Sequence, residues 1–258
     1  MKFNNRNVFI SPKANIGKNV RIGDDTVIYD NVIIKDNSVV CNNCVIGEPL
    51  NDYYYNDTYE NPITIIEENA LIRSHSIIYA GCNFGKEFIS GHRITIREFT
   101  IFGHNCRVGT GVDIQGHANF GNFCWLLAEL HICQYSTVGN FVFIYPYVIF
   151  TNDPHPPSKI NKGPTIGDFT QITVSSVLLP GVKIGKHVVV GAGSVVRNDV
   201  DDYQLVMGDP AKMIKDVRDI RSKETGGEHY PWPYKFSRRM PWEEIGFEKW
   251  LQENPQYQ

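Results

Sequence analysis

The sequence lacks the features that direct a chain to a membrane or to nucleic acid. Its 258 residues contain no apolar run near the 18 or so residues that a membrane span needs. The net charge is −3 and there is no polybasic run, so neither a bilayer nor a nucleic acid is an expected partner. The N-terminus, MKFNNRNVFIS, has no apolar central stretch of the kind found in secretory signals. We therefore expect a cytoplasmic protein.

What the sequence does have is a six-residue repeat. Every sixth residue is aliphatic or aromatic from Ile10 to Ile46, from Ile66 to Phe150 and from Ile166 to Val196, and of these 28 repeat positions only Ser90 is polar. A period of six fits neither a helix nor simple strand alternation, but it fits a solenoid with sides six residues long. The repeat predicts an all-β solenoid with three sides per coil and a little over nine coils, about 45 Å long at a strand spacing of about 4.8 Å.

Smaller residues and turn formers accompany the repeat. A smaller residue stands four positions after most repeat positions, where we expect it to fill the gap beside the large core side chain. Glycine directly follows the repeat position in 12 of 28 cases, and asparagine is frequent three positions after it, as at Asn19, Asn31 and Asn105. Both residue types tolerate a left-handed backbone, so we expect them to form the sharp corners.

The six cysteines fit the same pattern. Cys41 and Cys44 form a CxxC pair, which can indicate a metal site or a redox site. However, Cys44, Cys82, Cys106 and Cys124 all fall at the small inward position. We therefore expect free, buried cysteines and no metal.

The repeat is interrupted twice and then ends. Residues 48–65 contain four tyrosines, and residues 151–165, TNDPHPPSKINKGPT, contain four prolines. A solenoid accommodates insertions as loops on one face, which is often the binding face. We predict a β-helix over 1–200 with these two loops, and a tail over 201–258 in which a helix after Pro241 packs through Trp242, Phe247 and Trp250.

Two segments resemble a known family. GVKIGKHVVVGAGSVVRNDV and the following VMGDPAK (206–212) are similar to the hexapeptide-repeat acyltransferases. That resemblance implies a left-handed parallel β-helix, a homotrimer, and a coenzyme A site at the end of the helix. Handedness follows from the resemblance alone, because left-handed crossovers run against the usual preference.

Further segments narrow the resemblance. GEPLNDYYYNDTYEN, NALIRSHSIIYAG, GHRITIRE, TNDPHPPS and YPWPYKFSRRMPWEE resemble the N-acetyltransferases that act on dTDP-3-amino-3,6-dideoxyhexoses, and the dTDP-3-amino-3,6-dideoxy-α-D-glucose enzymes in particular. The implied reaction is acetyl-CoA-dependent N-acetylation of a dTDP-linked amino sugar, which supplies a surface glycan. Three points stay open: whether the amine is at C3 or C4, whether the sugar is gluco or galacto, and whether the donor is acetyl or a short hydroxyacyl group.

Residues 18 apart should stack on successive coils, which gives candidate catalytic residues. Gly116, Gln134 and Asn152 form one such ladder, and His117, Tyr135 and Asp153 form the next. Both ladders end where the second loop leaves. The predicted catalytic residues are Gln134, Asn152, Asp153, His117 and His131.

Gln134 occupies the position at which related sugar O-acyltransferases carry a histidine base. An amide cannot act as a general base at neutral pH, whereas an amine is already nucleophilic when neutral. With a pKa of about 7.7 to 8.0, about 10 to 20% of such an amine would be neutral at pH 7. The missing histidine therefore favours an amino sugar, which Gln134, Asn152 and Asp153 could orient. The proton acceptor stays open.

The remaining candidate residues bind the two substrates. Arg73 and Arg97 both follow repeat positions and are expected to clamp a diphosphate together. Acceptor binding is also assigned to His92 and, through stacking on thymine or packing between subunits, to Tyr53, Tyr54 and Tyr59. The resemblance places coenzyme A at Val174, Ser175, Ser176, Ala192, Gly193, Arg197 and Lys212.

Two other classes of function are alternatives. A zinc carbonic anhydrase on the same solenoid needs three histidines that meet across a subunit interface, and the eight histidines here show no matching spacing. A solenoid used only for display or binding fits poorly with two polar loops and a coenzyme A-like end.

Overall fold

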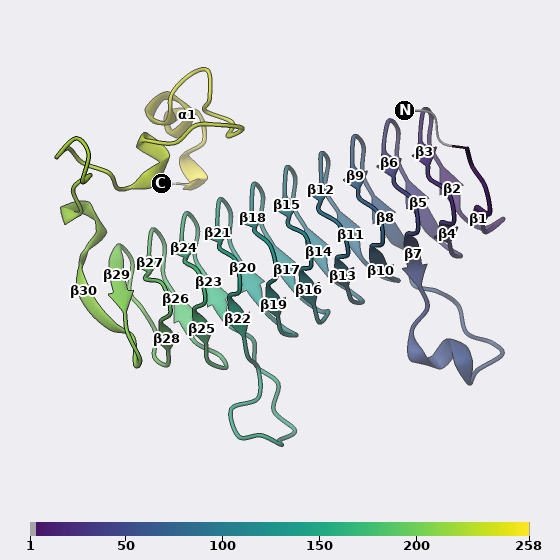
Figure 1. Cartoon of the computed structure of the whole chain (residues 1–258), viewed down its shortest axis with the longest axis horizontal. Helices are drawn as coiled ribbons and strands as arrows, with labels where there is room; N and C mark the ends of the chain where they lie inside the picture. The colour runs from purple at the N-terminus through teal and green to yellow at the C-terminus, as the bar shows by residue number, and fades with distance from the viewer. Residues whose placement is uncertain (1–3, 258) are drawn as a thin grey trace.

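The computed structural model describes residues 4–257, which form a left-handed parallel β-helix with a tail folded against one side (Figure 1). Each of the 28 repeat positions lies in one of the strands β1–β28, and those from Ile22 onward are all buried. Ile10 is 41% exposed because no coil covers the N-terminal end. The fold predicted from the repeat is thus confirmed.

The strands stack into three sheets, one on each side of the prism. Sheet A contains β1 (Phe9–Ile10), β4 (Val27–Ile28), β7 (Val45–Glu48), β10 (Ile77–Tyr79), β13 (Thr95–Ile96), β16 (Asp113–Ile114), β19 (His131–Ile132), β22 (Ile149–Phe150), β25 (Val177–Leu178) and β28 (Val195–Val196). Sheet B contains β2 (Asn15–Ile16), β5 (Val32–Ile34), β8 (Thr64–Ile66), β11 (Asn83–Phe84), β14 (Ile101–Phe102), β17 (Asn119–Phe120), β20 (Thr137–Val138), β23 (Thr165–Ile166) and β26 (Lys183–Ile184). Sheet C contains β3 (Arg21–Ile22), β6 (Val39–Val40), β9 (Leu71–Ile72), β12 (Ile89–Ser90), β15 (Arg107–Val108), β18 (Trp125–Leu126), β21 (Phe143–Ile144), β24 (Gln171–Ile172), β27 (Val189–Val190), β29 (Gln204–Met207) and β30 (Lys212–Asp216).

The prediction of a little over nine coils falls slightly short. Sheet C reaches eleven strands because the chain after Val200 does not leave the prism at once. Strand β29 pairs in parallel with β27 and continues the solenoid, and β30 then returns antiparallel to β29. The expected boundary at residue 200 thus falls inside the stacked sheet.

Three edges join the sheets, and we name each by the sheets it connects. The A–B edge includes residues 97–99, 115–117 and 133–135, the B–C edge includes 85–87, 103–105 and 121–123, and the C–A edge includes 73–75, 91–93, 173–175 and 191–193. Asn19, Asn31 and Asn105 have positive φ at these corners, as predicted.

The role predicted for the glycines is wrong. Of the 12 glycines that follow repeat positions, only Gly47 has a positive φ. The others are required by close approach between coils: a Cβ at Gly85 would lie 2.6 Å from the carbonyl carbon of Gly103, and one at Gly109 would lie 2.6 Å from that of Leu127. Glycine is required at these positions because the backbones of successive coils lie too close together for a side chain.

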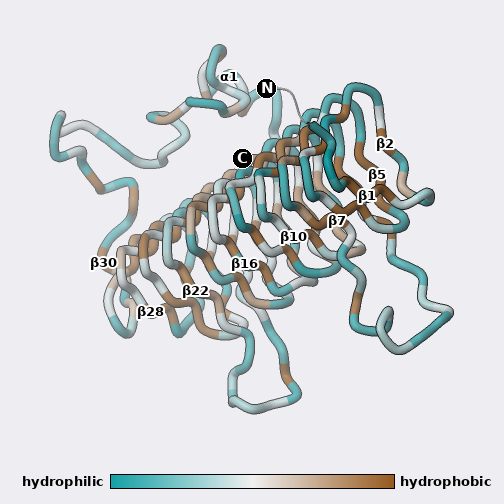
Figure 2. The backbone as a smooth tube through the Cα atoms, turned by 45° about the vertical axis from the view of Figure 1, so that its right-hand side comes forward, coloured by the Kyte–Doolittle hydropathy of each residue, from teal (hydrophilic) through white to brown (hydrophobic). Residues whose placement is uncertain are grey.

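The inward small positions are confirmed. Cys44, Cys82, Cys106 and Cys124 are fully buried free thiols, and the Cys82 Sγ donates to the carbonyl of Arg97 at 3.2 Å. Hydrophobic residues recur along the coils, and the two loops are mostly hydrophilic (Figure 2).

The tail closes over sheet C through an aromatic cluster. Its elements are the 3-10 helices η2 (Val217–Asp219), η3 (Trp232–Tyr234) and η4 (Pro255–Tyr257), and the helix α1 (Phe247–Glu253). Trp242, Phe247 and Trp250 are buried, as predicted, and the Trp232 Nε1 donates to the Phe169 carbonyl at 2.8 Å. Helix α1 begins after Gly246, whose φ of +81° separates it from the turn after Pro241. At seven residues it is too short to cross a membrane, and the described chain has no longer α-helix.

Candidate functional site

Both loops leave the same edge of the prism. The first runs between β7 and β8 and carries the 3-10 helix η1 (Asn51–Tyr54), and the second runs between β22 and β23, so both depart from the A–B edge (Figure 1). Five strand spacings of sheet A separate them, or about 24 Å at about 4.8 Å per spacing. The corners between the loops form the candidate functional site.

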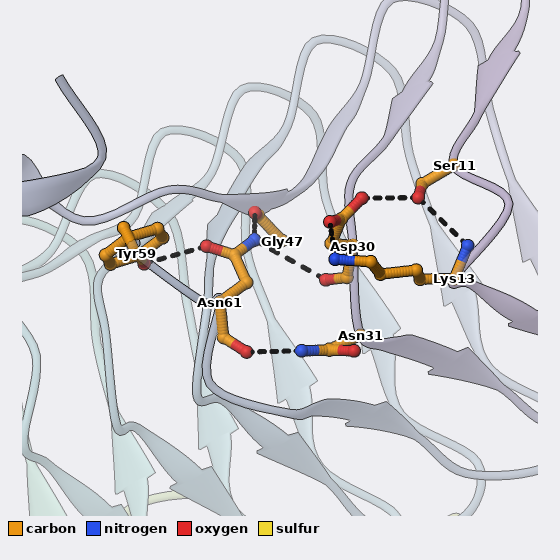
Figure 3. Close-up of polar contacts among 7 residues, drawn as sticks. All are labelled: Ser11, Lys13, Asp30, Asn31, Gly47, Tyr59 and Asn61. Carbon is orange, nitrogen blue, oxygen red and sulfur yellow. Dashed lines mark hydrogen bonds and ion pairs between the residues drawn. The ribbon is translucent and has the colours of Figure 1, made fainter. Parts of the chain in front are cut away.

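Asn61 anchors the first loop to the solenoid (Figure 3). Its Nδ2 donates to the Gly47 carbonyl at 2.8 Å, and its own carbonyl accepts from Asn31 Nδ2 at 2.7 Å. The Tyr59 hydroxyl donates to Asn61 Oδ1 at 2.7 Å and accepts from the Leu50 amide at 3.1 Å. Beside these contacts, Asp30 contacts Ser11 and pairs with Lys13 at 3.1 Å (Figure 3). Tyr59 therefore holds the loop in place.

The other predicted tyrosines are available to a ligand. Tyr53 makes edge contacts with Tyr54 and Tyr59 at ring distances of 5.2 and 5.9 Å, and Tyr54 remains 61% exposed. A cavity of about 160 Å³ lies beside them, lined by Phe9, Tyr29, Asp30, Pro49, Tyr53, Tyr59 and Asn61. The first loop thus presents aromatic rings at one end of the A–B edge.

The structure does not bring Arg73 and Arg97 together within one chain. Arg97 lies on the A–B edge, where it forms a two-pronged ion pair with Glu98 at 3.0 and 3.1 Å and sits 5.3 Å from the Tyr79 ring centre. Arg73 lies on the C–A edge, as does His92, whose Nδ1 is 2.9 Å from the Ser74 hydroxyl. The two arginines lie on different edges because four sides, not a multiple of three, separate Arg73 from Arg97, and their joint binding of a diphosphate stays a prediction.

Aromatic rings stack along the middle of the site. His117 lies between Phe99 and Tyr135, with ring centres 5.1 and 5.3 Å apart. His117 and Tyr135 both have positive φ, which turns their side chains outward at successive corners. The predicted stacking of His117 on Tyr135 is confirmed.

Asp153, the third member of that ladder, organises the second loop. Its Oδ1 accepts from the His155 amide at 2.9 Å and from the Ser158 hydroxyl at 2.6 Å, and its Oδ2 accepts from the Ser158 amide at 2.8 Å. Ser158 and these amides hold the pKa of Asp153 below its usual value, so the carboxylate is charged at neutral pH. The Asn152 carbonyl accepts from the Lys162 amide at 2.8 Å and closes the base of the loop.

The second loop returns across Gln134. A Cβ on Gly163 would lie 2.7 Å from the Gln134 carbonyl oxygen and 2.5 Å from the Ser136 nitrogen. Gln134 is half-buried between this return and its own coil. The structure thus brings His117, Gln134, Asn152 and Asp153 to one part of the A–B edge.

Asp113 is a further residue of the site that sequence reasoning missed. Its Oδ2 lies 3.0 Å from His131 Nδ1 and accepts from Gln115 Nε2 at 2.7 Å. This contact with Asp113 raises the pKa of His131, and the same contact lowers the pKa of Asp113. Asp113 and His131 are 18 residues apart and directly paired between β16 and β19, so the spacing used for the ladders also contained this signal.

The pair interrupts an apolar surface. The outward residues of sheet A, in order, are Phe9, Val27, Val45, Ile77, Thr95, Asp113, His131, Ile149, Val177 and Val195. Phe9, Ile77 and Ile149 are 53%, 37% and 42% exposed. A carboxylate paired with an imidazole in the middle of such a face is therefore a candidate for a functional role.

The residues expected to hold the donor divide into three groups. Val174, Ser175, Ala192 and Gly193 are exposed on successive corners of the C–A edge, where the Gly193 amide donates to the Val174 carbonyl at 2.9 Å. Ser176 is fully buried and donates to Thr173, so it cannot touch a ligand. Arg197 lies on the A–B edge and pairs with Asp209 at 2.9 Å, and Lys212 is exposed at the start of β30.

Among residues 4–257, no group of three or more histidines, cysteines or acidic residues is arranged to hold a metal ion.

Comparisons with known proteins agree with the repeat. The family described as bacterial transferase hexapeptide (six repeats) matches residues 6–48 and 163–198. A galactoside O-acetyltransferase of Lactococcus lactis is 32% identical over 125 residues, covering 45% of this chain and 56% of that protein. A 2,3,4,5-tetrahydropyridine-2,6-dicarboxylate N-acetyltransferase of Clostridium perfringens is 49% identical over 69 residues, or 27% of this chain and 28% of that protein.

The structure of an Arabidopsis UDP-N-acetylglucosamine acyltransferase shares the fold, with a TM-score of 0.64 and 16% identity over 81% of this chain and 72% of that one. The chain spans about half the length of the curated relatives it matches. It thus carries transferase hexapeptide repeats and has acetyltransferases among its homologues.

Proposed function

We propose that this hexapeptide-repeat chain is an acetyl-CoA-dependent N-acetyltransferase that acts on a dTDP-linked 3-amino-3,6-dideoxyhexose for surface glycan biosynthesis. The observation that carries the proposal is the arrangement of the A–B edge. Exposed tyrosines stand at one end, the second loop stands at the other, and Asp113 and His131 lie beside the edge near the second loop.

The acceptor would lie along this edge. A span of about 24 Å suits an extended nucleoside diphosphate sugar. The thymine would stack on Tyr53 and Tyr54 at the first loop. The diphosphate would take the Arg97 guanidinium in place of Glu98, because a guanidinium binds phosphate and carboxylate in the same two-pronged geometry. The amino sugar would then reach Gln134 and the second loop.

The chemistry requires one proton to be removed. The neutral amine attacks the thioester carbonyl, the C–N bond forms, and the C–S bond then breaks to release the thiolate of coenzyme A. Gln134 and Asn152 would orient the amine and the developing oxyanion. His131, with Nδ1 held by Asp113, presents its other nitrogen as an acceptor for the ammonium proton, and the thiolate is the alternative acceptor.

The donor would bind at the opposite border of sheet A. Exposed backbone at Val174, Ser175, Ala192 and Gly193 suits the amide groups of a pantetheine arm, and Lys212 suits a phosphate. Both borders flank the apolar outer face of sheet A. We propose that further copies cover this face in a homotrimer and enclose the reaction between subunits.

The Asp113–His131 pair also favours a second candidate, O-acetylation of a sugar hydroxyl. A hydroxyl needs a base as it attacks, and an imidazole oriented by a carboxylate is such a base. Other nucleotide-linked amino sugars, or a hydroxyacyl donor, fit the same edge.

A mass-spectrometric screen separates these candidates. dTDP- and UDP-linked sugars, each as the amino and the hydroxy form, would be incubated with acetyl-CoA and the purified chain. We expect a gain of one acetyl group on the dTDP-amino sugars alone. Acetylation of the hydroxy forms at equal rates would replace the first candidate with the second, and no product from any sugar would refute both.

A further inference from the structure

A second cavity lies at the B–C edge, on the opposite side of sheet C from the donor residues. It has a volume of about 550 Å³ and lies between the solenoid and the tail. Its lining consists of Glu87, Ile89, Asn105, Arg107, Phe123, Arg239, Met240 and Pro241. None of these residues belongs to the acetyl-transfer site proposed above.

The cavity gathers two arginines and one carboxylate, Glu87, which in the described part of the chain forms no ion pair with either of them, so positive charge is in excess. Arg107 comes from the outer face of β15 and Arg239 from the tail, and Arg238 is adjacent to it. Within residues 4–257, none of the three forms an ion pair. Burial lowers the pKa of Arg107, and the nearby charges of Arg239 and Arg238 lower it further, against a smaller opposite effect of Glu87. The folded chain therefore holds like charges together, which a bound anion would relieve.

The Arg107 side chain and the backbone of Arg239 are held in place. The Arg107 guanidinium lies 5.4 Å from the Trp125 ring centre, a cation–π contact that fixes its plane. Arg239 has a φ of +60° in a turn where its amide donates to the Glu243 carboxylate at 2.6 Å. Met240 and Trp242, which follow Arg239, are 4% and 1% exposed, so the turn is anchored in the aromatic cluster.

The rest of the lining indicates the kind of anion. Glu87 and Asn105 can accept hydrogen bonds from hydroxyl groups, and Asn105 can also donate one. Ile89, Phe123, Met240 and Pro241 offer an apolar surface on which a sugar ring can lie. The charge suits a phosphate, which two guanidinium groups bind in a two-pronged manner.

We propose that this cavity binds a phosphorylated sugar, with Arg107 and Arg239 on the phosphate and Glu87 and Asn105 on the hydroxyls. The ligand would connect the tail to sheet C. The proposal does not depend on the acetyl-transfer reaction, because the two sites lie on different edges.

Calorimetry on the full chain tests it with glucose 1-phosphate, inorganic phosphate and glucose as probes. We expect glucose 1-phosphate to bind, phosphate to bind more weakly, and glucose not to bind. Arg107→Gln and Arg239→Gln should each raise the Kd for glucose 1-phosphate by about 10- to 100-fold, the scale of a charge-assisted hydrogen bond. Equal affinity for phosphate and for glucose 1-phosphate would overturn the sugar part of the proposal.

Arg21→Gln is the matched control. Arg21 is the outward residue of β3 in the same sheet, far from the tail, and it also forms no ion pair within the described chain. Arg97→Gln, in the proposed acceptor site, is the second control. Absence of binding at millimolar concentration, or loss of binding in either control and not in the Arg107 and Arg239 variants, would overturn the proposal. Unchanged melting temperatures of the unliganded variants would show that they fold.

Discussion

His131 Nδ1 lies 3.0 Å from Asp113 Oδ2 across the adjacent strands β19 and β16. The contact raises the pKa of His131 above its usual value of about 6.5. Only the neutral imidazole accepts a proton, so kcat/KM should rise with pH through a limb centred above pH 6.5. Asp113→Asn removes the charge, so the limb should move to lower pH and kcat/KM at pH 8 should fall about tenfold.

His131→Ala should lower kcat/KM by about 100-fold. General-base catalysis contributes about 10²- to 10⁴-fold, and the lower end applies here because an amine depends on a base less than a hydroxyl does. The same variant should flatten the acidic limb between pH 6 and pH 9. His117→Ala is the control, and it should leave the limb in place. A loss of four orders of magnitude in either variant would mean that a conventional histidine mechanism operates.

Gln134→Ala should cost at most about 10- to 100-fold in kcat/KM, the scale of hydrogen bonds in a preorganised site. Asn152→Ala should cost more, and Asp153→Asn should cost the most because it removes a charge. Ser158→Ala, which removes a hydroxyl that bonds Asp153 and the Ile160 backbone inside the loop, is the matched control. If Ser158→Ala and Asp153→Asn lose activity equally, Asp153 acts by shaping the loop and not by contacting the substrate.

Lys212→Ala should raise the KM for acetyl-CoA several-fold and leave the KM for the sugar nearly unchanged, because a phosphate contact contributes mainly uniform binding. Lys183→Ala, an exposed lysine on the outer face of sheet B, serves as the control. Steady-state kinetics with each substrate varied in turn provide the measurement. The opposite order of effects would place the donor elsewhere.

His187 should make the fold sensitive to acid. It is stacked between Phe169 and Tyr203 at 4.8 Å from each, and burial lowers its pKa to about 4. The unfolded chain therefore binds more protons between about pH 6.5 and pH 4, so stability should fall as the pH drops through this window, by up to about 3 kcal/mol. His187→Phe keeps the stacking and should remove this part of the decline. Melting temperatures at pH 7 and pH 5 test it, and an unchanged decline in the variant would contradict the assignment.

Gly109→Ala should destabilise the solenoid more than Gly193→Ala, although only Gly193 has a positive φ. A Cβ at Gly109 meets backbone at 2.6 Å, whereas nothing lies within 4 Å of one at Gly193. We expect about 1 kcal/mol at Gly193 from backbone strain and clearly more at Gly109. Chemical denaturation of both variants gives the comparison, and the reverse order would restore the explanation by left-handed corners.

The sequence by itself determined the solenoid, its 28 repeat strands and its two loops. A narrow prism admits one large side chain per side, so the length of a side appears in the sequence as the period of the hydrophobic repeat. The six-residue spacing that gives the ladders at Gln134 and Asp153 also predicts two further features. Ile46 and Phe150 are fifteen sides apart, so both loops leave one edge, and Asp113 stacks under His131.

Only the tertiary structure decided which partners the outward-facing side chains contact. It turned the Asp153 carboxylate into its own loop and paired Arg97 with Glu98, because rotamers and local donors are not periodic. The burial of Ser176, by contrast, follows from the repeat, because Ser176 stands four positions after Ile172. The place of the tail was also undetermined, since residues 217–257 have no repeat. The contact of Trp232 with Phe169 and the meeting of Arg239 with Arg107 depend on aromatic packing between segments far apart in the chain.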